Sequence, residues 1–346
     1  MLKTTTVGSY PRKNKPKDTL RKPSVSEEEA FEMIEWAVKD QCELGLNFIT
    51  DGESYRENMY WFYQLRVDGV NCNEKKYKQF SLGGSTDGVD LTKAHPLVNE
   101  KGGFGIECAV VNEKIQNPKW DLAKKWRKAQ DSTKGNVIVK QTITGPHMLS
   151  RFSNNERKDL YKDDVELAYA YAECIKDEVR ELENQGCEYI QLDEPVLTES
   201  PSECTWAADV INDIIDSFDK IHFSVHICGG NAHRRRGYFG KYTDMIDGLK
   251  KLKAHELHLE HCTLHYDMLE IFNHYEFKGI LSFGVVDQRT DEIETVEEIH
   301  KRINPVLERF DQNKILISSE CGFGHVPLEI TRAKLGKLVE SAKKYK

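Results

Sequence analysis

The feature that most restricts the fold of this sequence is an alternation of short β-type segments with long helical patterns along the chain. Such an alternation is typical of a parallel sheet covered by helices. The segments with the composition of a strand are 4–8, 48–51, 137–142, 189–192, 223–226, 256–260, 279–284 and 315–318. Eight βα units are the number that closes a barrel. We therefore predict an α/β fold in which residues 1–346 form a single (β/α)8 TIM barrel.

One segment interrupts this alternation. Residues from about 60 to 135 separate the second and third predicted strands, and they contain glycine-rich turns, an alternating run at 106–111 and a helical stretch at 120–129. A structureless loop of that length is uncommon in a compact domain. We therefore predict an insertion made of a hairpin and a helix, which either covers the functional site or contacts another subunit.

Charge and hydropathy exclude several classes of partner. The chain has 49 Lys and Arg against 57 Asp and Glu, a net charge of −8, so there is no basic field that would attract nucleic acid. No stretch approaches the roughly 18 apolar residues of a membrane span, and the N-terminus lacks the apolar core of a signal peptide. The nine cysteines are an odd number, typical of reduced thiols. We expect a cytoplasmic protein that binds neither nucleic acid nor membranes.

Reactive side chains gather where the predicted strands end. In a (β/α)8 barrel the active site lies at the carboxyl ends of the strands. The strand ends that carry acidic groups, histidine or cysteine are 51–53, 193–194, 226–228, 260 and 320–321. We expect these side chains to share one rim of the barrel.

Four of these residues have the chemistry of a zinc site. His226 and Cys228 are two positions apart at a strand end, so their side chains point the same way. Glu260 and Cys321 add an oxygen and a second sulfur from other strands of the rim. These donors suit tetrahedral zinc better than magnesium, calcium or an iron–sulfur cluster. Cys262 is two positions after Glu260 and would point to the same side of an extended strand, so it is an alternative ligand. We nevertheless expect it to pack beyond the strand end.

A series of short motifs runs along nearly the whole chain in a specific order. They are TTTVGSYPR, DGESYRENMYWF, ITGP, IQLDEP, HICGGN, LHLEH, GVVDQRT and SSECGFG. Together they resemble the cobalamin-independent methionine synthases, specifically their zinc-bearing C-terminal barrel and its short stand-alone relatives. The chain begins at the first predicted strand, so the resemblance implies a form without the additional N-terminal barrel.

The resemblance implies a function and a set of substrate contacts. It implies a zinc-dependent methyltransferase that transfers a methyl group to the thiol of L-homocysteine and forms methionine. Val7 and Ser9 would bind the carboxylate of the amino acid, while Glu53 and Asp193 would bind its ammonium group and act as catalytic residues. Structural explanations exist for Ser9, as part of a turn, and for Glu53, as a charge at the N-terminus of a helix.

Two positions depart from the pattern of the folate-using members. Arg289 stands where they have a histidine that resembles a general acid, and arginine keeps its proton because its pKa exceeds about 12. Phe152 is the nearest aromatic residue where they have a tryptophan that resembles a platform for the pterin. We keep Arg289 as a catalytic candidate and Phe152 as a binding candidate. The donor is therefore either a methylated folate or a corrinoid protein.

Other readings of the same residues stay open. Alkyl transfer to another thiol, for example from an epoxyalkane to coenzyme M, is the closest alternative, but a sulfonate would need cations where Glu53 and Asp193 stand. A non-catalytic barrel stabilised by zinc is the second alternative. The consecutive arginines at 234–236 are expected to begin a solvated helix rather than to bind an anion.

Overall fold

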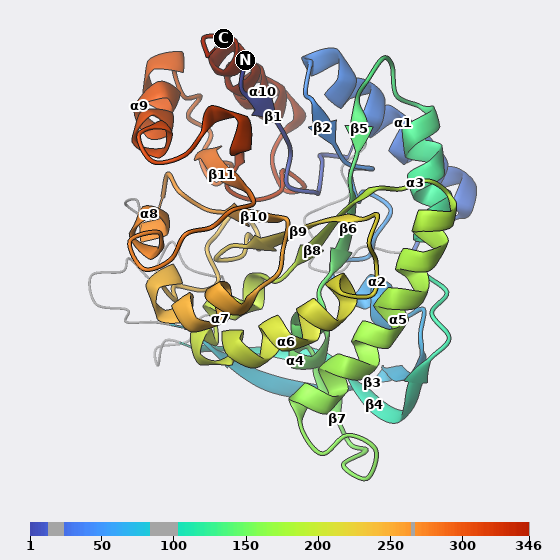
Figure 1. Ribbon diagram of the computed structural model, residues 1–346. Helices are drawn as coiled ribbons and strands as arrows, with labels where there is room; N and C mark the ends of the chain where they lie inside the picture. Colours follow the sequence, from blue (N-terminus) through green and yellow to red (C-terminus); the bar gives the residue numbers. More distant parts are fainter. Residues whose placement is uncertain (13–23, 84–102, 264–266, 346) are drawn as a thin grey trace.

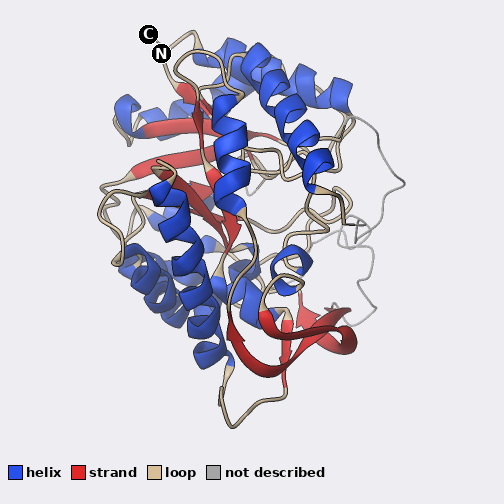
Figure 2. Ribbon diagram, turned by 90° about the vertical axis from the view of Figure 1, so that its right-hand side faces the viewer, coloured by secondary structure: helices blue, strands red, loops and turns tan. Residues whose placement is uncertain are grey.

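The computed structural model describes residues 1–12, 24–83, 103–263 and 267–345 (Figure 1). Within these residues, parallel strands curl into a barrel with helices around the outside, as Figures 1 and 2 show. The barrel strands are β1 (Lys3–Thr4), β2 (Phe48–Ile49), β5 (Ile138–Val139), β6 (Gln141–Thr144), β8 (Tyr189–Asp193), β9 (His222–Ile227), β10 (Glu256–Leu259), β11 (Ile280–Val286) and β12 (Ile315–Ser319).

The pairing of these strands closes the barrel. One sheet has the order β1-β12-β11-β10-β9-β8-β6, and a second contains β2 and β5. A parallel bridge between Thr5 and Phe48 joins β1 to β2. The third predicted strand is divided at Lys140 into β5 and β6. Together these two form one strand of the barrel, which joins the two sheets. The predicted TIM barrel is confirmed, while its description as a single domain stays a prediction.

The helices alternate with the barrel strands, and capping residues in the sequence explain where two of them begin. The helices are α1 (Glu27–Leu44), α3 (Leu122–Asp131), α4 (Pro146–Arg151), α5 (Asp164–Asn184), α6 (Cys204–Ile215), α7 (Ile246–Lys251), α8 (Asp267–Ile271), α9 (Val296–Leu307) and α10 (Leu328–Ala342). Ser26 and Glu29 form the capping box that begins α1, and Asp163 caps α5. No helix in the described part of the chain is both long and apolar enough to cross a membrane.

The predicted insertion between the second and third barrel strands is confirmed, and it contains the predicted hairpin, whereas the predicted helix belongs to the barrel. Strand β3 (Asp68–Ser81) pairs antiparallel with β4 (Gly103–Gln116), and β4 also pairs with β7 (Ser153–Asn155). The short helix α2 (Trp61–Gln64) precedes the hairpin. Helix α3 packs between α1 and α5, so it occupies the barrel's own helix position rather than projecting from it. The predicted glycine turns extend into 84–102, outside the described residues.

Candidate functional site

The carboxyl ends of the strands open into a cleft with a volume of about 520 Å³. Two groups of its lining residues differ in chemistry. We call them the polar wall and the aromatic wall, after the side chains that predominate in each. The polar wall consists of Val7, Ser9, Glu53, Asp193, His226, Cys228 and Cys321. The aromatic wall consists of Tyr60, Phe104, Met148, Phe152 and Tyr238.

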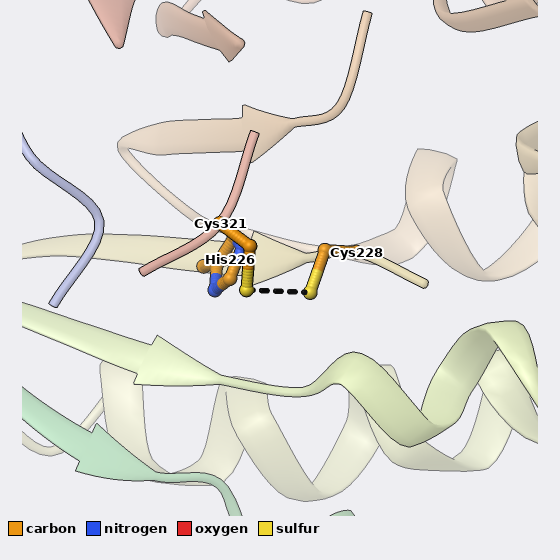
Figure 3. A group of neighbouring side chains, drawn as sticks. All are labelled: His226, Cys228 and Cys321. Carbon is orange, nitrogen blue, oxygen red and sulfur yellow. Dashed lines mark hydrogen bonds between the residues drawn. The ribbon is translucent and has the colours of Figure 1, made fainter. Parts of the chain in front are cut away.

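Three of the four predicted metal ligands lie together in the polar wall. One ligand atom each of His226, Cys228 and Cys321 lies within 4.8 Å of the others, and the two sulfurs are 3.6 Å apart (Figure 3). His226 is buried near the end of β9, and its Nδ1 is 2.9 Å from Oδ1 of Asp193. Its Nε2 is buried without a hydrogen-bond partner among the described residues. These donors form a group that can hold a metal ion.

The thiol pKa values of the two cysteines in this group are shifted in opposite directions. The hydrogen bond with Cys228 lowers the pKa of Cys321, and the charges of His226 and Arg289 lower it further, while burial opposes them. The same hydrogen bond, together with burial, raises the pKa of Cys228. Cys321 is therefore the sulfur that loses its proton first.

Glu260 lies at the end of β10, outside this group of three. Its carboxylate accepts a hydrogen bond from the Gly229 N–H (3.0 Å), and it pairs with Arg236 (2.8 Å) and Arg289. Burial disfavours the charged form of Glu260, but the two arginines outweigh that effect and lower its pKa. Cys262 is also outside the group of three. Glu260 is thus an anion held by two guanidinium groups.

The prediction of a solvated helix at the three arginines is wrong. No helix begins at 234–236 in the described structure, because the chain turns back after Gly229, whose carbonyl accepts the Gly237 N–H at 2.8 Å. His233 and Arg234 both have positive φ, which a helix does not allow. Arg236 is buried, with its Nε 2.7 Å from the Tyr238 carbonyl oxygen.

Arg289 lies behind the polar wall and is not among the residues that line the cleft. Its guanidinium pairs with Glu260 and Glu320 and donates to the Gly230 carbonyl (2.8 Å). Burial disfavours its charge, but these carboxylates more than compensate and raise its pKa well above the usual value. Arg289 therefore keeps its proton and acts here as a charge partner.

The two carboxylates predicted to bind an ammonium group both line the cleft. Glu53 accepts a hydrogen bond from the Thr142 hydroxyl (2.6 Å), and burial raises its pKa, partly offset by Arg56. Glu53 has a φ of 52°, and the next helix begins only at Trp61, so the explanation of Glu53 as a helix charge is wrong. Asp193 accepts hydrogen bonds on Oδ1 from His226 and from Gln191 (2.7 Å).

The predicted carboxylate-binding segment lies against the loop that follows β12. The Ser9 hydroxyl accepts the Gly324 N–H (3.2 Å), and the Ser9 carbonyl accepts the Phe323 N–H (2.8 Å). A Cβ added to Gly322 would lie 2.1 Å from the Ser9 hydroxyl oxygen, so this position has no room for a side chain. The carbonyl of Val7 accepts a hydrogen bond from Gln191 (2.9 Å).

The aromatic wall contains residues that the sequence analysis missed. The ring of Phe152, just after α4, lies 4.5 Å from that of Tyr60, and Phe104 of β4 lies 5.8 Å from Tyr238. Phe104 belongs to the hairpin and Tyr238 to the loop after β9, so neither residue is itself at a strand end of the barrel in the sequence. The alternation of the run beginning at 103 is a signal that places Phe104 on one of the two faces of a strand.

Comparisons with known proteins agree with this geometry. The family described as "Cobalamin-independent synthase, Catalytic domain" matches residues 2–87 and 81–344. A methionine synthase of Sulfolobus acidocaldarius is 28% identical over 347 residues, which cover 98% of this chain and 91% of that protein. One from Saccharolobus islandicus is 28% identical over 350 residues, which cover 99% of this chain and 94% of that protein.

Two solved structures share the fold. A B12-independent methionine synthase from Shewanella sp. W3-18-1, in complex with selenomethionine, aligns with a TM-score of 0.80 at 22% identity, covering 99% of this chain and 97% of that one. A putative vitamin-B12 independent methionine synthase from Listeria monocytogenes aligns with a TM-score of 0.66 at 19% identity, covering 92% and 89%. At these identities the likeness shows a common architecture.

Proposed function

The chain belongs to the family of cobalamin-independent synthase catalytic domains, and on that basis we propose that it methylates the thiol of L-homocysteine to give methionine. The observation that carries this proposal is the polar wall. It sets two thiols and an imidazole, which suit a metal-bound sulfur, beside two carboxylates, which suit an α-ammonium group.

We propose that His226, Cys228 and Cys321 hold zinc. The unpartnered, buried Nε2 of His226 and the close sulfurs of the two cysteines fit that ion. Three protein ligands with one open position are the pattern of catalytic zinc. When bound, zinc would deprotonate a coordinating substrate thiol at neutral pH. Glu260 stays the proposed fourth ligand, whose position the substrate thiol would take, and Cys262 is its alternative.

The remaining polar wall would bind the amino-acid end of homocysteine. Asp193 and Glu53 would contact the ammonium group, whose charge favours the ionised form of Glu53 that burial disfavours. Ser9 and the backbone of Val7 would contact the carboxylate. Arg289 would act indirectly, by holding Glu260 and Glu320 as anions behind the wall.

The aromatic wall would receive the methyl donor. Phe152 offers a ring face to a flat donor, either a methylated folate or the corrin of a carrier protein. In the transfer, the bond between the substrate sulfur and the methyl carbon forms as the bond from that carbon to the donor breaks. The donor keeps the electron pair of the broken bond, and the sulfur becomes a thioether.

Zinc-edge X-ray absorption on metal-quantified protein, with and without L-homocysteine, tests the proposal. We expect one zinc per chain and a sulfur neighbour gained when homocysteine is added, and we expect His226→Ala and Cys321→Ser to lose metal. Protein without zinc, or zinc whose coordination ignores every thiol tried, would show that homocysteine methylation is wrong. Turnover with methylcobalamin or with 5-methyltetrahydrofolate then distinguishes the two donors.

The same experiment separates the alternative functions. If coenzyme M adds the sulfur neighbour and homocysteine does not, alkyl transfer to another thiol is the function. If zinc is present with four protein ligands and no thiol changes it, the metal is structural. The two carboxylates of the polar wall favour homocysteine, because they repel a sulfonate and attract an ammonium group.

A further inference from the structure

A row of hydrogen bonds leads from the inside of the barrel to the polar wall. Lys140, which lies between β5 and β6, donates a hydrogen bond to Oε1 of Gln191 in β8 (2.6 Å). Nε2 of Gln191 donates to Oδ1 of Asp193 (2.7 Å) and to the carbonyl of Val7 (2.9 Å). Oδ1 of Asp193 is also 2.9 Å from Nδ1 of His226. One glutamine amide thus contacts two parts of the proposed homocysteine site.

The orientation of that amide is completely specified. A glutamine offers two donor hydrogens on nitrogen and one acceptor oxygen. Here the nitrogen faces the oxygens of Asp193 and Val7, while the oxygen faces the ammonium group of Lys140. Without Lys140, the oxygen of Gln191 would be a buried acceptor that has lost its partner, a costly state that favours movement of the amide.

Lys140 differs from Lys334, the other lysine that is fully buried among the described residues. Lys334 is buried against the Glu294 carboxylate (2.8 Å), which balances its charge. Lys140 donates to a neutral amide, and burial lowers its pKa to about 8, with the charge of Glu256 opposing this effect. A lysine buried on a neutral partner is expensive for stability, which points to a role in the site.

The two oxygens of Asp193 divide two tasks. Both of its hydrogen bonds fall on Oδ1, and its side chain lines the cleft with one-tenth of its surface exposed (10%). We propose that Lys140 and Gln191 are positioning residues that fix the Asp193 carboxylate, so that one oxygen orients His226 and the other binds the substrate ammonium group. This inference rests on the proposed function.

The test compares two thiols on zinc-loaded protein. 4-Mercaptobutanoate has the thiol and carboxylate of homocysteine but no ammonium group. We expect Lys140→Met to weaken homocysteine binding roughly 10- to 100-fold, because a displaced Asp193 loses its charged hydrogen bond to the ammonium group, and to weaken 4-mercaptobutanoate much less. Calorimetric titration of both ligands gives the ratio of their dissociation constants. An unchanged ratio in Lys140→Met would overturn the inference.

A double-mutant cycle tests the route through the amide. Because Lys140 acts through Gln191, the double variant with Lys140→Met and Gln191→Leu should bind homocysteine as weakly as Gln191→Leu alone. Additive losses would contradict that route. If Lys140→Met folds poorly, Lys140→Gln takes its place in the test. Because glutamine keeps a hydrogen-bond donor, this variant should retain part of the preference for homocysteine.

A matched control separates positioning from general stability. Lys334→Met also removes a buried ammonium group, and it should lower the melting temperature while leaving the ratio of the two dissociation constants unchanged. An equal change of the ratio in Lys334→Met would overturn the inference. If the unmodified protein loaded with zinc binds neither thiol, the proposed function is wrong and the inference fails with it.

Discussion

The polar wall and the aromatic wall face the same cleft but are built from different parts of the chain. Asp193 ends β8 and is paired in register with His226 of β9, so the hydrogen bonds of the barrel place both side chains. Phe104 belongs to β4 of the inserted hairpin, and Phe152 follows a six-residue helix. The proposed thiol end of the site is thus part of the barrel, whereas the proposed donor end depends on segments added to it.

The largest expected effect separates the metal group from its neighbours. Sharing the roughly 10–16 kcal/mol of a structural zinc site over four ligands assigns about 3 kcal/mol to each, so Cys321→Ser should weaken zinc binding about 100-fold. Competition with a chromophoric chelator measures this loss. Cys262→Ser is the control and should leave zinc affinity unchanged, since Cys262 lies outside the group. An equal loss in Cys262→Ser would make Cys262 a ligand.

Two adjacent carboxylates sharpen the comparison within the polar wall. Asp193→Asn should weaken homocysteine binding roughly 10- to 100-fold, since a hydrogen bond to a charged group contributes about 1.5–3 kcal/mol. Glu194→Gln should instead lower the melting temperature, because Glu194 accepts the N–H groups of His147 and Met148 (both 2.9 Å) at the start of α4. Titration calorimetry and thermal unfolding distinguish the two. Loss of homocysteine binding in Glu194→Gln alone would reverse these roles.

A change in the aromatic wall should affect the donor alone. Phe152→Leu removes ring stacking of about 1 kcal/mol, so the KM for the methyl donor should rise roughly fivefold while homocysteine binding is unchanged. Phe80→Leu is the control, since the Phe80 ring lies 4.8 Å from Phe152 and Phe80 is not a lining residue of the cleft. Weaker homocysteine binding in Phe152→Leu would show that the two walls are not separate.

The smallest effect depends on pH and concerns the support of the aromatic wall. Burial opposes a charge on His147, but Glu194 and Glu203 outweigh it and raise its pKa. Protonated His147 therefore contributes stability that is fully present below its unfolded pKa of about 6.5 and is lost as pH rises through the raised folded value. The difference in melting temperature between the unmodified protein and His147→Gln should shrink from pH 5.5 to pH 9. A constant difference would contradict this.

The polar wall could be predicted from sequence because strand ends follow from periodicity and parallel strands share a rim. That reasoning brought His226, Cys228 and Cys321 together correctly. It could not foresee that Glu260 pairs with Arg236, because the backbone turn that carries Arg236 back to the wall has no periodic signature. Ion pairs between distant segments depend on tertiary packing, which a local pattern does not report.

The aromatic wall shows a second limit. The alternating run at 106–111 predicted a hairpin strand, but not which face of the hairpin meets the cleft. Gln191 was missed for a different reason. A polar residue within a barrel strand is as compatible with the buried core as with a site, and only its contacts with Asp193 and Val7 show which it serves.

The contact between Ser9 and Gly324 joins residues 315 positions apart, and it has a consequence for how the protein matures. Strand β1 is paired with β12, the strand farthest along the described part of the chain. The cleft can therefore assemble only after residues 316–324 have left the ribosome, and contacts of such long range form slowly. Until then β1 lacks its partner on that side, and an unpaired strand edge is a site where another chain can pair.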